Sequence, residues 1–266
     1  MKTIYHFSGA GNDFVVIDGR EGDVSAFREI PRIQALCKEH KTDGLMILGS
    51  GDASVDFTME FYNPDGSGGM MCGNGGRCIV AFADYLGIRP ASGDVFLFRA
   101  PDGLHTGEIL ARPEDGLWEV RIKMIDVQGI TPMLGGYFLN TGTRHFVKFV
   151  EDVEKVDIDT EGKALRWNEA FAPVGTNVNF VHVAPDGLHV RTFEKGVEGE
   201  TLACGTGLTA CALVAHHAGV PTATPGAYRL RARQDWLSVS FTPEADEKFT
   251  DVYLTGPARL VRIYGV

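Results

Sequence analysis

The chain has 266 residues, of which 44% are hydrophobic and 23% are charged. It can therefore bury one large core or two medium ones, and it is not a disordered, collagen-like or coiled-coil protein. Its 25 Lys and Arg residues against 35 Asp and Glu residues give a formal net charge of −10. Because the net charge is negative and no segment is rich in Lys or Arg, the chain would not attract phosphate groups or anionic lipids, and neither nucleic acid nor a membrane surface is an expected partner.

The first residues, MKTIYHFSGAGND, become polar and glycine-rich too early for a secretory leader. No apolar run approaches the roughly 18 to 20 residues needed to span a bilayer, so a cytoplasmic location is expected. The five cysteines are odd in number and widely spaced, which does not suggest a disulfide framework, and we expect reduced thiols. No CxxC or HExxH motif is present, and therefore no metal is expected.

In chain order, the first half begins with a strand and glycine turn around residues 11–16 and continues with an amphipathic helix at 33–39. An apolar segment at 43–47 and a short alternating strand at 59–63 come next. A turn rich in cysteine and glycine at 71–75 then leads into an apolar run that ends at a glycine, the pattern of a buried helix with a C-terminal cap.

The second half repeats this order of segments. Residues 142–147, 176–180, 190–194 and 203–207 match the segments of the first half at offsets of 131 to 133 residues, and a second apolar helix ends at Gly219. Four matches in the same order indicate two similarly folded halves.

The predicted fold class is therefore α+β, with two pseudo-symmetric halves and an active site in the cleft between them. Each half is expected to be a curled, mostly antiparallel sheet around a central buried helix. We expect the N-terminal half to span residues 1–130 and the C-terminal half residues 131–256. A C-terminal strand at about 257–266 is expected to return to the first half.

The two cysteine-glycine turns are expected to lie at helix N-termini, with Cys72 in one half and Cys204 in the other. A helix N-terminus offers backbone N–H groups and about half a positive charge, so it favours a carboxylate ligand and a thiolate over a thiol. If the halves face each other, one thiolate can remove a proton from a carbon beside a carboxylate while the opposite thiol delivers a proton to the other face. The pattern predicts a racemisation that needs no cofactor.

The residues that carry this chemistry also resemble a known family, the diaminopimelate epimerases, which are cofactor-independent enzymes of bacterial lysine and peptidoglycan precursor synthesis. The resemblance covers most of the chain. Its strongest parts are FSGAGNDF (Phe7 to Phe14), NPDGSGGMMCGNGGRC (Asn63 to Cys78), GTNVNF (Gly175 to Phe180) and RTFEKGVEGETLACGTG (Arg191 to Gly207). It implies interconversion of LL- and meso-diaminopimelate, and a small amino-acid substrate as the partner.

The resemblance also implies the roles of individual residues. Cys72 and Cys204 fall on the two acid/base positions, with His145 as the helper of Cys72 and Glu194 as the helper of Cys204. The backbone groups that bind the substrate carboxylate fall on Gly73, Asn74, Gly205 and Thr206. The substrate-contacting asparagines fall on Asn12, Asn63 and Asn177.

Three positions depart from the family pattern. Thr143 stands where many members have an asparagine, Lys195 replaces an arginine, and Gly44 replaces a glutamine that some members carry. We expect Thr143 and Lys195 to contact the far end of the substrate, so the departures leave the reaction centre intact and affect recognition of the second amino-carboxylate.

Other interpretations stay open at this stage. The chain could be a racemase or epimerase for another amino acid, a non-catalytic amino-acid-binding protein, or an isomerase similar to those of phenazine biosynthesis, although that group lacks the cysteine pair. Cys72 and Cys204 could be packing residues, which is the usual role of a free cysteine. A homodimer formed through an exposed strand edge is also compatible with the pattern.

Overall fold

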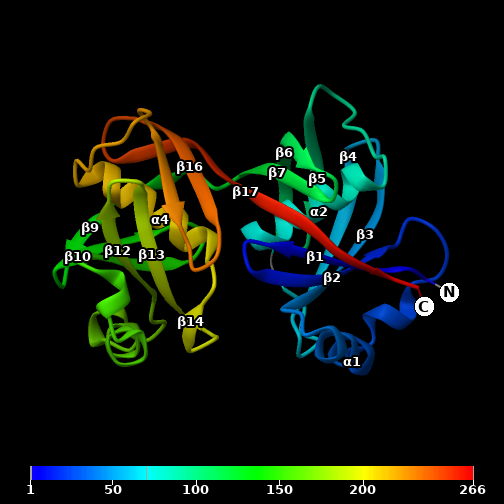
Figure 1. Ribbon diagram of the computed structural model, residues 1–266, viewed down its shortest axis with the longest axis horizontal. Coiled ribbons are helices and arrows are strands. Elements are labelled where there is room, and N and C mark those ends of the chain that lie inside the picture. Colours follow the sequence, from blue (N-terminus) through cyan, green and yellow to red (C-terminus); the bar gives the residue numbers. More distant parts are fainter. Residues whose placement is uncertain (1, 70, 266) are drawn as a thin grey trace. The chain divides into compact units, whose positions relative to one another are not determined.

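The structure is a computed structural model that describes residues 2–69 and 71–265 (Figure 1). The chain forms two compact units: unit 1 comprises Met1–Ile122 with Gly256–Val266, and unit 2 comprises Lys123–Thr255. Residues 1 and 266, which bound the expected N-terminal half and its returning strand, lie outside the described residues, as does Met70 of the longest family motif.

Strands predominate in both units, and the described residues contain four α-helices, so the mixed α+β class predicted from the sequence is confirmed. The elements of unit 1 are β1 (Ile4–Gly9), β2 (Asn12–Asp18), the short helix η1 (Ser25–Arg28), α1 (Ile30–His40), β3 (Gly44–Asp52), β4 (Val55–Tyr62), α2 (Gly73–Tyr85), β5 (Val95–Ala100), β6 (Gly103–Glu114) and β7 (Leu117–Lys123). The elements of unit 2 are β8 (Val127–Gln128), β9 (Thr131–Met133), β10 (Gly136–Asn140), β11 (Arg144–Phe149), η2 (Val153–Lys155), η3 (Ile158–Gly162), α3 (Lys163–Arg166), η4 (Glu169–Phe171), β12 (Asn177–Ala184), β13 (Gly187–Glu194), β14 (Gly199–Thr201), α4 (Gly205–His217), β15 (Ala227–Arg231) and β16 (Trp236–Pro243). Strand β17 (Lys248–Tyr264) begins in unit 2 and ends in unit 1.

The strands of unit 1 form a closed series of pairings. From β1 to β7, each strand pairs with the next, and the pairing is parallel between β2 and β3 and between β4 and β5. The other pairings in the series are antiparallel. The C-terminal part of β17 then pairs antiparallel with both β7 and β1, which closes the sheet around α2.

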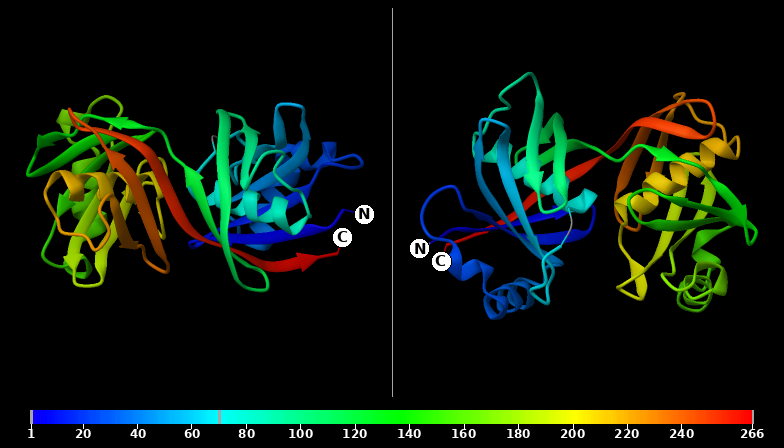
Figure 2. Two further views of the ribbon diagram at one scale, coloured as in Figure 1. Left: turned by 90° about the horizontal axis from the view of Figure 1, so that it is seen from above. Right: turned by 180° about the vertical axis from the view of Figure 1, so that it is seen from behind.

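The strands of unit 2 follow the same order of pairing directions. The series runs β10, β11, β12, β13, β15, β16, β17 and β8, and it is parallel between β11 and β12 and between β13 and β15. Helix α4 packs against β10 to β13, β15 and β16, as α2 packs against β1, β2, β3 and β6. Each unit is thus a curved sheet around one helix, as the views of Figure 2 also show.

The two central helices begin earlier than the apolar runs of the sequence. Helix α2 includes the glycines that follow Cys72, and every residue from Gly73 to Ala83 is buried. Helix α4 begins at Gly205 in the same way. Burial on all sides of a helix is expected inside a curled sheet, and it outweighs the low helix propensity of glycine. Both helices are followed by a glycine with positive φ, Gly87 and Gly219, as their sequences predict.

The strands nearest to each central helix are buried on both faces. In unit 1, Val15 and Ile17 of β2 pack with Leu36 of α1 on the outer face of the sheet, where Figure 1 shows α1. In unit 2, Phe146, Val178, Phe180 and Phe193 pack on the outer face with residues of the η2–η4 segment. Because strand side chains alternate between faces, the intervening residues of β11, β12 and β13 face α4.

Candidate active site

Cys72 is the N-cap residue of α2. Its backbone is extended, with φ −99° and ψ 149°, and its Sγ accepts a hydrogen bond from the N–H of Gly75 at 3.2 Å. The side chain is exposed. A sulfur that accepts a backbone N–H at a helix N-terminus is stabilised as a thiolate, because both the hydrogen bond and the helix dipole favour negative charge there.

A directed chain of hydrogen bonds lies beside Cys72. The fully buried Arg77 donates from Nη1 to the carbonyl of Gly73 at 3.2 Å and from Nη2 to Asn74 Oδ1 at 2.9 Å. Asn74 Nδ2 donates to Asn12 Oδ1, and Asn12 Nδ2 lies 3.4 Å from Asp43 Oδ2. Since a guanidinium can only donate, Arg77 fixes the orientation of the Asn74 carboxamide and, through it, that of Asn12. The chain thus connects two predicted substrate-binding asparagines to the start of α2.

Asn63 is placed differently from the other two asparagines of unit 1. Its Nδ2 donates to Ser67 Oγ at 3.0 Å, and its backbone N–H donates to the Ser67 carbonyl at 2.9 Å. Among the described residues, no hydrogen bond of its side chain to Asn12 or Asn74 is found. The structure places Asn63 in a turn, a position that suits asparagine for backbone reasons.

Cys204 is the N-cap residue of α4 and is only 9% exposed. Its Sγ lies 3.5 Å from Thr206 Oγ1. In the first turn of the helix, Thr209 Oγ1 donates to the carbonyl of Gly205 at 3.0 Å. The predicted position of each cysteine-glycine turn at a helix N-terminus is therefore found in both units.

His145 is completely buried in unit 2 and lies on the face of β11 that packs against α4. Its Nε2 lies 2.9 Å from Thr143 Oγ1 and 2.9 Å from Thr206 Oγ1. Burial lowers the pKa of His145 to about 3, so the ring is neutral at pH 7. The structure thus brings Thr143, His145, Cys204 and Thr206 together. Cys72, the residue that His145 is expected to help, belongs to unit 1.

Asn177, the first residue of β12, is bonded to the start of β11 and to the residue that follows β13, near this cluster. Its Oδ1 accepts the backbone N–H of Lys195 at 2.8 Å, and its Nδ2 donates to the Arg144 carbonyl at 2.9 Å and lies 3.3 Å from Thr143 Oγ1. The carboxamide therefore positions the backbone at Lys195 relative to Thr143. Both are the residues expected to recognise the far end of a substrate.

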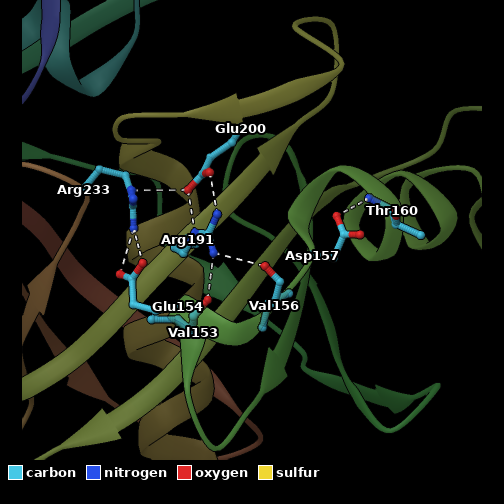
Figure 3. Close-up of polar contacts among 8 residues, drawn as sticks. All are labelled: Val153, Glu154, Val156, Asp157, Thr160, Arg191, Glu200 and Arg233. Atoms are coloured by element: carbon cyan, nitrogen blue, oxygen red, sulfur yellow. Dashed lines mark hydrogen bonds and ion pairs between the residues drawn. The ribbon is translucent and has the colours of Figure 1, made fainter.

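Glu194 and Lys195 lie where β13 turns back into β14, and the base of this hairpin is fixed by a charged pair (Figure 3). Arg191 donates from Nε and Nη2 to the two carboxylate oxygens of Glu200, both at 2.7 Å. Arg191 Nη1 also donates to the carbonyls of Val153 and Val156, at 2.9 and 3.1 Å. The guanidinium holds the pKa of Glu200 below its ordinary value. A bidentate pair of this kind restricts the hairpin that carries Glu194.

The tip of the same hairpin is held by Glu198. Its Oε1 accepts from Arg166 Nε and from the N–H of Gly196, both at 3.1 Å, and its Oε2 accepts from Trp167 Nε1 at 3.2 Å. The turn that contains Lys195 is therefore attached to α3.

The remaining cysteines differ from Cys72 and Cys204. Cys37, Cys78 and Cys211 are buried, and burial raises the pKa of each thiol. They are packing residues, as their positions inside helices predict. Across residues 2–69 and 71–265, no cluster of His, Cys, Asp and Glu could hold a metal ion. No helix in this part of the chain is long and apolar enough to cross a membrane.

The site contains residues that the sequence motifs alone do not single out. Arg77 could have been noticed as a charged residue inside an apolar run, and Asn179 as a polar residue within the strand NVNFVHV. No local sequence pattern predicts the pairing of Arg191 with Glu200, because it depends on how β13 pairs with β14 in the hairpin.

The whole fold has counterparts among solved structures. A phenazine biosynthesis protein of the PhzF family from Bacillus anthracis matches with a TM-score of 0.77 and 12% identity, covering 100% of this chain and 98% of that one. A hydroxyproline epimerase from Agrobacterium vitis matches with a TM-score of 0.68 and 15% identity, covering 100% of this chain and 90% of that one. The chain therefore has the fold of these two proteins. At such low identity, the likeness concerns the fold alone.

The sequence comparisons are more specific. The family model described as diaminopimelate epimerase matches residues 4–103 and 137–261. Proteins named diaminopimelate epimerase from Chlorobaculum tepidum and Aquifex aeolicus are 40% and 39% identical, and the matches cover 96% and 95% of this chain and 97% and 93% of theirs. The chain belongs to the diaminopimelate epimerase family, which is a family of isomerases of lysine biosynthesis, and the predicted resemblance is confirmed.

Proposed function

We propose that this protein interconverts LL- and meso-diaminopimelate by moving the α-hydrogen between the thiols of Cys72 and Cys204. The observation that carries this proposal is the equivalent position of the two cysteines, each the N-cap of the central helix of its unit. Family membership supplies the substrate. The predicted cleft between the halves is part of the proposal, because two thiols can invert one carbon only from opposite faces.

The proposed reaction is a proton transfer in which no group is oxidised or reduced. One thiolate takes the α-proton and becomes a thiol, and the electron pair of the broken C–H bond delocalises into the substrate carboxylate. The other thiol then gives its proton to the opposite face and becomes a thiolate. The two sulfurs have exchanged protonation states at the end, so each turnover prepares the protein for the reverse direction.

The helix N-termini are proposed to stabilise the carboxylate while it carries this additional charge. The backbone N–H groups of Gly73 and Asn74, and those of Gly205 and Thr206, belong to the first turns of α2 and α4, where N–H groups lack intrahelical partners. Loss of one such donor typically raises the barrier by about 3 to 4 kcal/mol. Asn12 and Asn63 are proposed as further contacts of the substrate.

The helper residues and the distal contacts complete the proposal. His145 and Glu194 are proposed to adjust the protonation of the thiols, Glu194 from the hairpin held by Arg191 and Glu200. Thr143, Asn177 and Lys195 are proposed to bind the second amino-carboxylate, since hydrogen bonds already hold them together. We place the reaction in the cytoplasm, because it requires reduced thiols, and the chain could act as a homodimer.

The experiment that tests the proposal is exchange of the α-hydrogen in D₂O, followed by proton NMR with reduced protein and no added cofactor. LL- and meso-diaminopimelate are offered beside a panel of ordinary amino acids, and wild type is compared with Cys72→Ala and Cys204→Ala. Cys37→Ala, which removes a packing thiol on α1, is the matched control.

Exchange with inversion that is confined to diaminopimelate, lost in both variants and kept in the control supports the proposal. Inversion of another amino acid alone would make the protein a related racemase. Absence of exchange with every substrate would indicate a binding protein.

A further inference from the structure

The Nδ1 atom of His145 faces a side-chain amide whose donor role is fixed by its other neighbours. We propose that Asn179 holds the neutral His145 ring in the tautomer with its proton on Nε2, so that His145 acts towards Thr206, and through it towards the sulfur of Cys204, only as a hydrogen-bond donor. Asn179 is then a positioning residue. The consequence for the reaction rests on the function proposed above, whereas the tautomer itself does not.

The orientation of the Asn179 carboxamide follows from its neighbours. Asn179 is completely buried, and one end of its side chain lies 3.1 Å from the carbonyl oxygen of Phe146, which can only accept. The amide nitrogen must therefore occupy that end. The other end is the carbonyl Oδ1, which accepts the hydroxyl of Thr192 at 2.9 Å, directly across the β12–β13 pair.

The tautomer of His145 follows from this orientation. Asn179 Nδ2 also lies 3.1 Å from His145 Nδ1. Because an amide NH₂ donates and does not accept, Nδ1 must be the acceptor and carries no proton. The buried ring is neutral, since burial lowers the pKa of His145 to about 3, and its single proton is therefore on Nε2.

The proton on Nε2 determines what the two threonines can do. Thr143 Oγ1 and Thr206 Oγ1 each lie 2.9 Å from Nε2 and share its N–H. Each hydroxyl oxygen is therefore an acceptor towards the ring. Asn177 Nδ2, at 3.3 Å, occupies more of the acceptor capacity of Thr143. Thr143 cannot donate to a protonated Nε2, so its hydroxyl proton goes to Thr206 Oγ1, 3.3 Å away. The hydroxyl proton of Thr206 is then available to the Cys204 sulfur, 3.5 Å away. Hydrogen bonds thus run outward from Asn179, through His145 and Thr206, to the sulfur.

This direction has a chemical meaning for the proposed acid/base pair. A hydroxyl that donates to sulfur stabilises the thiolate relative to the thiol. An imidazole whose Nε2 carries the proton cannot remove a proton through that nitrogen, so His145 supports a thiolate by donation and is not the base that generates it. The reverse tautomer would set two donors against each other at Nδ1.

The helix leaves space for this arrangement only because residue 207 is glycine. A Cβ built on Gly207 would lie 2.4 Å from Asn179 Oδ1 and 3.3 Å from His145 Cε1. The first turn of α4 therefore packs directly on the Asn179–His145 pair.

The test reads the ring nitrogens of His145 by long-range ¹H–¹⁵N NMR on ¹⁵N-histidine-labelled protein without substrate. The His145 signals are identified by their loss in His145→Gln. Wild type is expected to show a proton on Nε2, an unprotonated Nδ1 and no titration between pH 8 and pH 5. A proton on Nδ1, or a ring that becomes charged in this range, would overturn the proposal.

The decisive variant is Asn179→Asp, which replaces the donor at Nδ1 by a carboxylate acceptor. We expect a proton to appear on Nδ1 and kcat to fall by about tenfold or more, with a smaller change in KM. Asn179→Leu, which removes both polar ends, should give a mixture of tautomers. Asn168→Asp is the matched control. Asn168 caps η4 by accepting a hydrogen bond through Oδ1, which an aspartate can also do, and the substitution adds the same negative charge to unit 2.

An unchanged His145 spectrum in a folded Asn179→Asp protein would contradict the role of Asn179. The spectra are recorded without substrate, so they decide the tautomer even if the protein does not epimerise diaminopimelate. An active protein with the wrong tautomer would refute this inference and leave the proposed function intact.

Discussion

The N-terminus of α2 and that of α4 carry a cysteine in the same backbone position but in different surroundings. Cys72 is exposed, accepts the N–H of Gly75, and lies beside a buried guanidinium that is bound to the next carbonyl. Cys204 is nearly buried, its Sγ lies 3.5 Å from the uncharged hydroxyl of Thr206, and that hydroxyl is bonded in turn to the neutral ring of His145. A repeated fold can therefore hold two sulfurs with different affinities for a proton, and we expect Cys72 to be the more acidic thiol.

The largest expected effect comes from removing the charge on the α2 side. Arg77→Met takes away the donors to Gly73 and to Asn74 Oδ1 in a fully buried place, and should lower the free energy of unfolding by about 3 kcal/mol. The pKa of Cys72 should rise, because a nearby positive charge is lost. Urea unfolding and the pH dependence of Cys72 alkylation measure the two effects.

The matched change on the α4 side is Thr209→Val, which removes one hydroxyl bonded to the Gly205 carbonyl and should cost about 1 kcal/mol. If the pH dependence of Cys72 alkylation were unchanged in Arg77→Met, the guanidinium would not be the cause of a pKa difference between the two thiols.

The second effect concerns His145 and pH. Its folded-state pKa of about 3 lies below the ordinary value of 6.5, so the unfolded chain binds this proton first as the pH falls. The stability due to the neutral ring is complete above pH 6.5 and is lost progressively towards pH 3, with a loss of about 2 kcal/mol at pH 5.

Urea unfolding between pH 8 and pH 4 should therefore show a steeper decline for wild type than for His145→Gln. Carboxylates titrate in both proteins and cancel in the difference. His40→Gln, on α1, is measured alongside as the control for the loss of one histidine. Equal slopes for His145→Gln and wild type would show that the ring is accessible to protons in the folded state.

The third effect compares the small residues of the two first turns. Gly207→Ala places a Cβ 2.4 Å from the buried Asn179 Oδ1, so we expect a loss of about 2 kcal/mol in spite of the better helix propensity of alanine. In Gly75→Ala the Cβ would lie 3.3 Å from Cys72 Sγ and Met46 Sδ, which is tight but not a clash with a fixed polar group. Thermal unfolding should rank Gly207→Ala as the more destabilised, and the opposite order would contradict the packing described for α4.

The smallest effect is expected at Thr206. Thr206→Val removes the hydroxyl beside Cys204 Sγ and should raise the pKa of this thiol by about one unit or less, whereas Thr206→Ser keeps the hydroxyl and the wild-type value. The pH dependence of Cys204 alkylation in a Cys72→Ala background measures it. A shift in both variants would assign the effect to packing.

The sequence predicted the two central helices and their cysteine N-termini, because apolar runs bounded by glycine are local signals. It did not predict α3, which is only four residues long. It did not reveal that the glycines after Cys72 and Cys204 are themselves helical, since burial inside a sheet overrides propensity. Strand alternation places Asn177 and Asn179 on one face, but only the parallel pairing of β11 with β12 brings Asn179 to His145. That contact depends on a register between segments more than 30 residues apart, which no single-segment pattern contains.

Strand β17 imposes an order on how this protein is made. Its first residues pair with β16 and β8, and its last residues pair with β7 and β1. A ribosome therefore completes nearly all of the N-terminal unit long before it adds the strand that closes that unit. Until the last residues emerge, β1 and β7 remain edges without their final partner, and unpaired edges are where a nascent chain associates wrongly. The unit that is synthesised first is thus the one that must wait until β17 has been made.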